Sequence, residues 1–116
     1  MEKVVDGEAA LEVFDEVARV GQGSLEVRVP ELEFPVLTVS VRGGFAVVHC
    51  FEAPDRVALL YGDGAVAAGD TVEVPIADEL AVFSGEFVLK VADARDALAE
   101  FVRSGDPAGL GEWWEL

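Results

Sequence analysis

The sequence has one cysteine, one histidine and only eight basic side chains among its 116 residues. The lone Cys50 excludes an intramolecular disulfide framework and fits a reducing compartment. One histidine and one cysteine do not supply the ligands of an ordinary zinc site, so we expect neither metal nor cofactor. No apolar run is long enough to cross a bilayer, and the N-terminus lacks the basic and apolar regions of a secretory signal. We therefore expect a cytoplasmic protein that does not contact membranes.

Acidic residues dominate the charge. There are 23 of them against 8 basic residues, for a net charge of −15 and an isoelectric point near 4.1. The excess is spread along the chain and is not gathered in a tail. A surface of this sign repels nucleic-acid phosphates, so we expect no nucleic-acid partner. It attracts basic proteins and accelerates their encounter, although acidity can also serve solubility alone.

Helical periodicity marks the two ends of the chain. Apolar residues recur at three- and four-residue spacing over residues 8–20, with Asp6 as the expected N-cap, and again over residues 92–103. Glycines follow both stretches, which is typical of helix C-termini. A chain of this length forms one domain, here residues 1–116. The patterns predict a core that includes Phe14, Val17, Val47, Leu59, Leu98 and Phe101.

Strand-like runs fill the middle of the chain. They predict strands at residues 25–29, 37–41, 45–51, 57–61 and 71–74. Gly43 and Gly44 favour a type I′ hairpin turn, which needs positive φ at both positions, whereas residues 83–90 fit either strand or loop. We predict an α+β fold, with an antiparallel sheet of five to six strands and an N-terminal and a C-terminal helix packed on one face.

The sequence offers little catalytic machinery. His49 and Cys50 are adjacent on a predicted strand, so their side chains point to opposite faces and cannot form a dyad. Asp63 and Asp70 resemble half of a calcium loop, but Ala-Val-Ala-Ala at 65–68 supplies no ligands. No carboxylate pair stands out as an acid and base. We expect a protein that is not an enzyme; a small carboxylate enzyme that uses Glu31, Glu33, Asp63 or Asp70 is the alternative.

Two segments favour contact with a partner. Acidic and apolar residues alternate between Pro30 and Pro35, which in an extended chain places the carboxylates on one side. Trp113 and Trp114 cannot both face inward, so one packs under the second helix and the other is partly exposed between glutamates. The partner-binding residues that we predict are Glu31, Glu33, Asp55, Asp63, Asp70, Glu112, Trp114 and Glu115.

The C-terminal region resembles a known family. Residues 97–107, Ala-Leu-Ala-Glu-Phe-Val-Arg-Ser-Gly-Asp-Pro, followed by Glu112-Trp113, are similar to the C-terminal signature of a family of bacterial immunity proteins. Members of that family accompany toxins of polymorphic and contact-dependent systems, often nucleic-acid deaminases. The resemblance implies a protein that binds a cognate toxin domain and occludes its basic substrate cleft. A generic acidic adaptor for a basic protein is the alternative.

Overall fold

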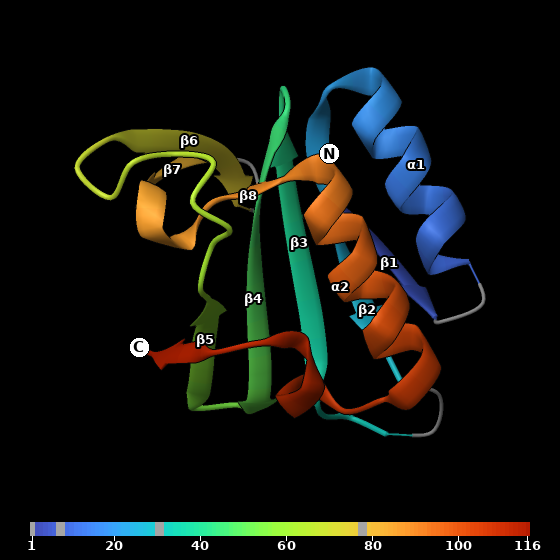
Figure 1. Ribbon diagram of the computed structural model, residues 1–116. Coiled ribbons are helices and arrows are strands. Elements are labelled where there is room, and N and C mark those ends of the chain that lie inside the picture. Colours follow the sequence, from blue (N-terminus) through green and yellow to red (C-terminus); the bar gives the residue numbers. More distant parts are fainter. Residues whose placement is uncertain (1, 7–8, 30–31, 77–78) are drawn as a thin grey trace.

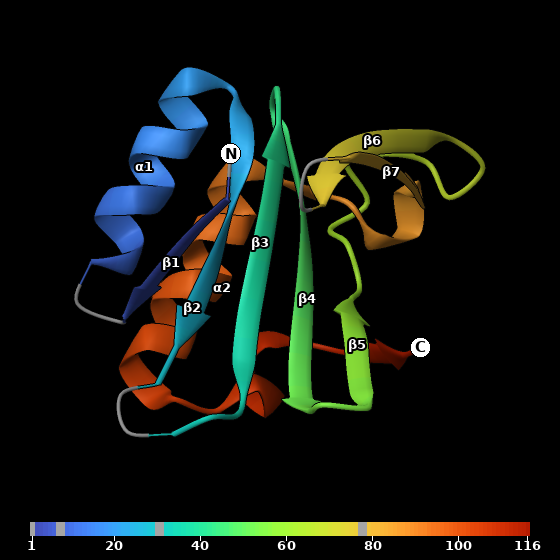
Figure 2. The same cartoon turned by 180° about the vertical axis from the view of Figure 1, so that it is seen from behind.

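The computed structural model describes residues 2–6, 9–29, 32–76 and 79–116 (Figures 1 and 2). The elements follow in the order β1 (Glu2–Asp6), α1 (Ala10–Val20), β2 (Gln22–Arg28), β3 (Val36–Arg42), β4 (Phe45–Ala53), β5 (Arg56–Leu60), β6 (Thr71–Ile76), β7 (Glu79–Ser84), the 3-10 turn η1 (Gly85–Phe87), β8 (Leu89–Lys90), α2 (Val91–Ser104), the 3-10 turn η2 (Pro107–Leu110) and β9 (Trp113–Glu115).

A twisted sheet forms the centre of the molecule. Its strands lie in the order β1-β2-β3-β4-β5-β9, and the short β8 pairs with the start of β4. Every pair is antiparallel except β1 with β2, which run parallel. Both helices cover one face of this sheet (Figure 1), and β6 and β7 form a separate two-stranded hairpin. The predicted α+β architecture, with the two helices on one face, is confirmed.

The sheet separates two apolar cores because alternate side chains of a strand point to opposite faces. Val48 and Cys50 pack with Phe14, Leu98 and Phe101 under the helices. Val47, one residue along, packs instead with Leu59, Val74 and Val88 beneath the β6–β7 hairpin. All six residues predicted for the core are buried, namely Phe14, Val17, Val47, Leu59, Leu98 and Phe101.

Several local details differ from the sequence-based predictions. Helix α1 begins at Ala10, with Ala9 in the N-cap position and no side-chain cap, while Asp6 belongs to β1. In the β3–β4 turn only Gly43 has a positive φ, 62°, so the predicted type I′ turn is wrong. Residues 83–90 divide between the end of β7, η1 and β8. Within the described parts of the chain, no helix is long and apolar enough to cross a membrane.

Candidate protein-binding surface

His49 and Cys50 lie on opposite sides of the sheet, as predicted. Cys50 belongs to the core under the helices, where burial and the nearby charge of Glu52 raise its pKa to about 12. His49 faces the hairpin, and its ring makes an edge contact with Phe83, with the centroids 5.4 Å apart. Burial lowers the pKa of His49 to about 4. The pair therefore holds neither a thiolate nor an accessible base at neutral pH.

The carboxylate of Asp63, in the loop after β5, holds two backbone segments together. Asp63 accepts hydrogen bonds from the backbone N–H of Ala65 at 2.9 Å and of Lys90 at 2.8 Å, just before α2 begins. Although partial burial opposes the shift, the hydrogen bonds from Asp93, Lys90 and Ala65 lower the pKa of Asp63. The same hydrogen bond with Asp63 raises the pKa of Asp93. Among the described residues no group of three or more His, Cys, Asp and Glu side chains could hold a metal ion.

Three aromatic rings lie close to one another: one follows β5, one belongs to η1 and one to β9. The centroids of Tyr61 and Phe87 are 5.4 Å apart, and each lies 6.4 Å from the centroid of Trp114. The indole of Trp114 stands at 89° to the Tyr61 ring and is 51% exposed, whereas the other two residues are half-buried. We call Tyr61, Phe87 and Trp114 the aromatic corner.

Two glycines allow the loop of residues 61–70 to close against η1. The Gly62 N–H donates to the Glu86 carbonyl at 2.6 Å, and the Gly85 N–H donates to the Asp70 carbonyl at 2.8 Å. A Cβ at Gly62 would collide with the Val88 carbonyl, and one at Gly85 with the Ala67 carbonyl. The close backbone approach that positions Phe87 beside Tyr61 therefore requires glycine at both positions.

Strand register places a carboxylate beside the aromatic corner. Leu59 pairs with Trp114, and the Tyr61 N–H donates to the Glu112 carbonyl at 2.9 Å, which continues the same register. Side chains two residues apart on a strand share a face, so Glu112 lies on the same face as Trp114. Tyr61 is its neighbour across the strand pair, on that same face. The backbone carbonyls of Asp70 and Glu86 accept hydrogen bonds from the N–H groups of Gly85 and Gly62. Both acidic residues are exposed. Of the predicted residues, Glu112 and Trp114 therefore lie on one face of this strand pair, while Asp63 and Asp70 belong to the loop that follows β5.

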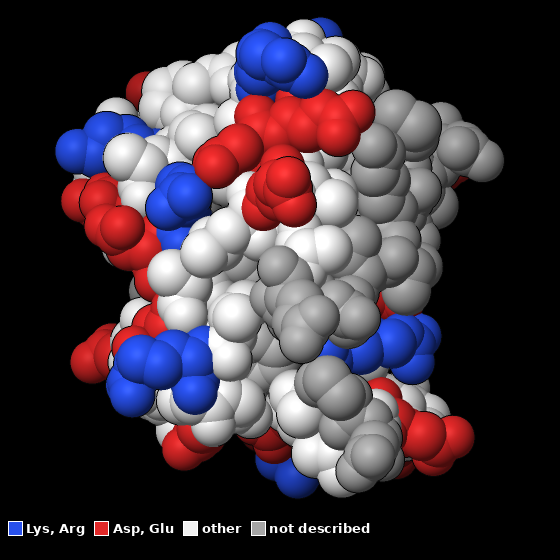
Figure 3. Space-filling model, turned by 90° about the vertical axis from the view of Figure 1, so that its right-hand side faces the viewer, with Lys and Arg blue, Asp and Glu red and all other residues white. Residues whose placement is uncertain are grey.

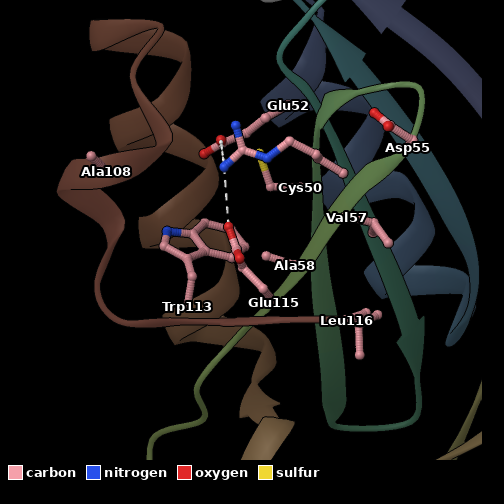
Figure 4. A pocket seen from close by; sticks show the side chains of 10 residues that line it. Cys50, Glu52, Asp55, Val57, Ala58, Ala108, Trp113, Glu115 and Leu116 are labelled. Atoms are coloured by element: carbon pink, nitrogen blue, oxygen red, sulfur yellow. Dashed lines mark hydrogen bonds and ion pairs between the residues drawn. The ribbon is translucent and has the colours of Figure 1, made fainter.

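Two other predicted residues lie on the opposite face of the β5–β9 pair. Asp55 and Glu115 line a cavity of about 170 Å³, with Cys50 and Trp113 on its walls (Figure 4). The Arg56 guanidinium there lies 3.1 Å from a Glu115 oxygen and 3.3 Å from a Glu52 oxygen. Glu115 is therefore partly neutralised, in contrast to Glu112. The two faces of β9 differ in charge although their glutamates are only three residues apart.

The remaining predicted residues belong to the segment between the two prolines. Glu33 is exposed, Leu32 is 55% exposed, and Phe34 is half-buried beside β3, so Leu32 does not cap the core. Glu31 lies outside the described residues. Glu33 is therefore the only predicted partner-binding residue of this segment that the structure places, and it lies away from the aromatic corner.

Acidic and basic side chains lie next to one another on the side that carries α1 (Figure 3). The Asp15 carboxylate accepts a hydrogen bond from Arg95 Nε at 2.7 Å, and this bond holds the pKa of Asp15 below its ordinary value. Glu12, Glu16 and Arg19 line the same depression. Asp15 on this side is thus neutralised by Arg95, whereas no basic side chain in the described parts of the chain forms an ion pair with Glu112 near the aromatic corner.

Sequence reasoning identified Trp114 and Glu112 but missed Tyr61, Phe87 and Glu86. The run of residues 57–61 predicted a strand that ends in Tyr61, without indicating which ring would pack on it. A Gly-Glu-Phe sequence after a strand is a weak signal for a turn that presents an aromatic side chain. No protein-family model matches the chain, and no curated protein matches it either.

Proposed function

We propose that this protein is an immunity protein that binds a cognate bacterial toxin domain in the cytoplasm and occludes its basic substrate cleft. A toxin that acts on nucleic acid, such as a deaminase, needs a basic cleft to bind phosphates. Carboxylates placed at the phosphate positions can block such a cleft without any chemical step. The similarity of residues 97–107 and Glu112-Trp113 to the immunity-protein signature supports this function.

The observation that carries the proposal is the distribution of charge. Five of the basic residues form ion pairs within the part of the chain that the structure describes, namely Arg28, Arg56, Lys90, Arg95 and Arg103. No basic side chain in the described parts of the chain forms an ion pair with Glu33, Asp70, Glu86 or Glu112. These exposed carboxylates remain free to attract a basic partner.

The proposed toxin-binding surface contains the predicted acidic residues and one aromatic anchor. Exposed acids raise the rate of association by long-range attraction, while a packed aromatic side chain slows dissociation. No catalytic residue and no cofactor is required for inhibition of this kind. In this proposal Trp114 and Glu112 make the central contact, and the other predicted residues act through longer-range attraction, namely Glu31, Glu33, Asp55, Asp63, Asp70 and Glu115.

Co-expression with the toxin domain encoded by the adjacent gene tests the function directly. The protein should rescue growth and should form a complex with the purified toxin domain. If it neither protects the cells nor binds the toxin, the proposed function is wrong. Binding to a basic protein that has no toxic activity would support the adaptor alternative instead.

Association kinetics test the role of the charge. Because the Debye length is about 8 Å in physiological salt, the association rate with the toxin should fall steeply as salt is added. Glu33→Lys should slow association and flatten this salt dependence, as measured by stopped-flow. Glu12→Lys on α1 changes the net charge equally and is the matched control. An association rate that does not depend on salt would show that the acidity serves solubility alone.

A further inference from the structure

We propose that the aromatic corner binds the guanidinium group of an arginine side chain on the partner protein, with Glu112 as the carboxylate that orients it. The inference rests on the proposed function in one respect, namely that the partner is a basic protein. It adds the chemical group that is recognised and the residues that recognise it. No part of the proposal depends on the identity of the toxin.

The Trp114 ring is held by packing on one side and is accessible to solvent on the other. Its indole is 51% exposed, yet it contacts Tyr61 and Phe87 and sits opposite Leu59 in the strand pair. The three rings are packed too closely for a cation to enter between them, with centroids 5.4 to 6.4 Å apart. A guest therefore stacks on the outer surface of Trp114, where cations bind aromatic faces within about 6 Å of the ring centroid.

Glu112 supplies the charge next to this ring. It shares the sheet face of Trp114 and is exposed. No basic side chain within the described residues forms an ion pair with it, whereas Glu115 on the other face is bonded to Arg56. Glu86, which precedes Phe87, is a second exposed carboxylate at this site. A cation on Trp114 would thus meet negative charge that no basic side chain of the described residues neutralises.

Arginine fits this arrangement better than lysine does. Its guanidinium is planar, so it can stack on the indole and donate two hydrogen bonds to one carboxylate in the same plane. A lysine ammonium is a compact, strongly hydrated point charge that cannot do both. An apolar side chain would leave Glu112 beside it without a partner. The occupant that matches both the ring and the carboxylate is therefore an arginine.

Binding of a hexa-arginine peptide tests the site without the toxin. In a Trp113→Phe variant the only indole is Trp114, so its fluorescence reports on the aromatic corner. We expect hexa-arginine to bind at least about threefold more tightly than hexa-lysine. If Trp113→Phe does not fold, the indole N–H signal of Trp114 in the wild-type NMR spectrum gives the same titration. Equal affinity for the two peptides, or no response of Trp114, would overturn the inference.

Two matched pairs of variants locate the contact. Glu112→Gln should weaken hexa-arginine binding, while Glu115→Gln, with the same change of charge on the opposite face, should not. With the cognate toxin, Trp114→Ala should raise the Kd about 30-fold, as expected for an aromatic anchor that the complex buries. Val20→Ala, at an exposed apolar side chain on α1, should leave the Kd unchanged. Equal effects within either pair would overturn the inference. If the toxin binds and the cells are protected although the aromatic corner is dispensable, the inference fails while the proposed function stands.

Discussion

His49 makes the stability of the protein depend on pH in a way that can be calculated. The side chain lies between Thr38 and Leu59 of the neighbouring strands and beneath Phe83 of the hairpin, and it is only 9% exposed. Within the described residues its Nδ1 atom has no hydrogen-bond partner. Because the imidazole is desolvated, its pKa falls from 6.5 to about 4.

The lowered pKa destabilises the folded protein in acid. Below pH 6.5 the histidine binds a proton in the unfolded chain but not in the folded one, so the free energy of unfolding decreases as the pH falls. The decrease from this group continues until the pH reaches the folded pKa of about 4. With a pKa of 6.5 in the unfolded chain and about 4 in the folded protein, about 2 kcal/mol is lost between pH 7 and pH 5, and about 3 kcal/mol by pH 4.

A comparison with His49→Phe isolates this contribution from the many carboxylates. Phenylalanine keeps an aromatic ring against Phe83 and cannot ionise. Urea denaturation at pH 7 and pH 5 should show that the wild-type protein loses about 2 kcal/mol more than the variant over this interval. Both measurements avoid the isoelectric point near 4.1, where solubility is lowest. If the two proteins lose stability in parallel, His49 ionises freely in the fold and the reasoning is refuted.

Three substitutions test the packing and the loop geometry by urea denaturation. Phe14→Ala empties a fully buried position and should cost about 3–5 kcal/mol, so a loss below about 1 kcal/mol would contradict the assigned core. Asp63→Ala removes two hydrogen bonds to backbone N–H groups and should cost about 1 kcal/mol, whereas the control Asp70→Ala should cost less than about 0.5 kcal/mol. Gly85→Ala forces a Cβ against the Ala67 carbonyl and should cost about 1–3 kcal/mol. In the control Gly69→Ala the new Cβ meets no atom within 4 Å, so stability should hardly change. Equal effects of the two substitutions would contradict the loop geometry.

The elements with strong local signals could be predicted from the sequence. Helix α2 runs from Val91 to Ser104, close to the predicted 92–103, because its apolar stripe and the following Gly105 define it locally. Strand β1 was missed, since Lys3 to Val5 lie between charged residues and are paired only through a parallel contact with distant Leu25 to Val27. A strand held by long-range pairing leaves little trace in its own five residues.

The same reason explains why only part of the candidate site was found. Trp114 stood out because two adjacent tryptophans on a strand cannot both be buried, and it is indeed half-exposed. Its contacts with Tyr61 and Phe87 join segments that are far apart in the sequence. They depend on the close approach of backbones at Gly62 and Gly85, which no local pattern encodes. The composition indicated an acidic surface, but only the tertiary fold shows which acidic and aromatic side chains lie together.

The β6–β7 hairpin forms a two-stranded sheet of its own. In the described residues it shares no backbone hydrogen bond with the main sheet, and a small apolar cluster around Val74 attaches it. The sheet face opposite the helices also holds Ser24 and Ser40, whose buried hydroxyls, like His49 Nδ1, have no partner within those residues. Each such atom costs about 1–3 kcal/mol while it is dry, so undocking of the hairpin recovers hydration energy and offsets the lost apolar contact. The amides of β6 and β7 should therefore exchange with solvent deuterium through local opening, well before those of β3 and β4.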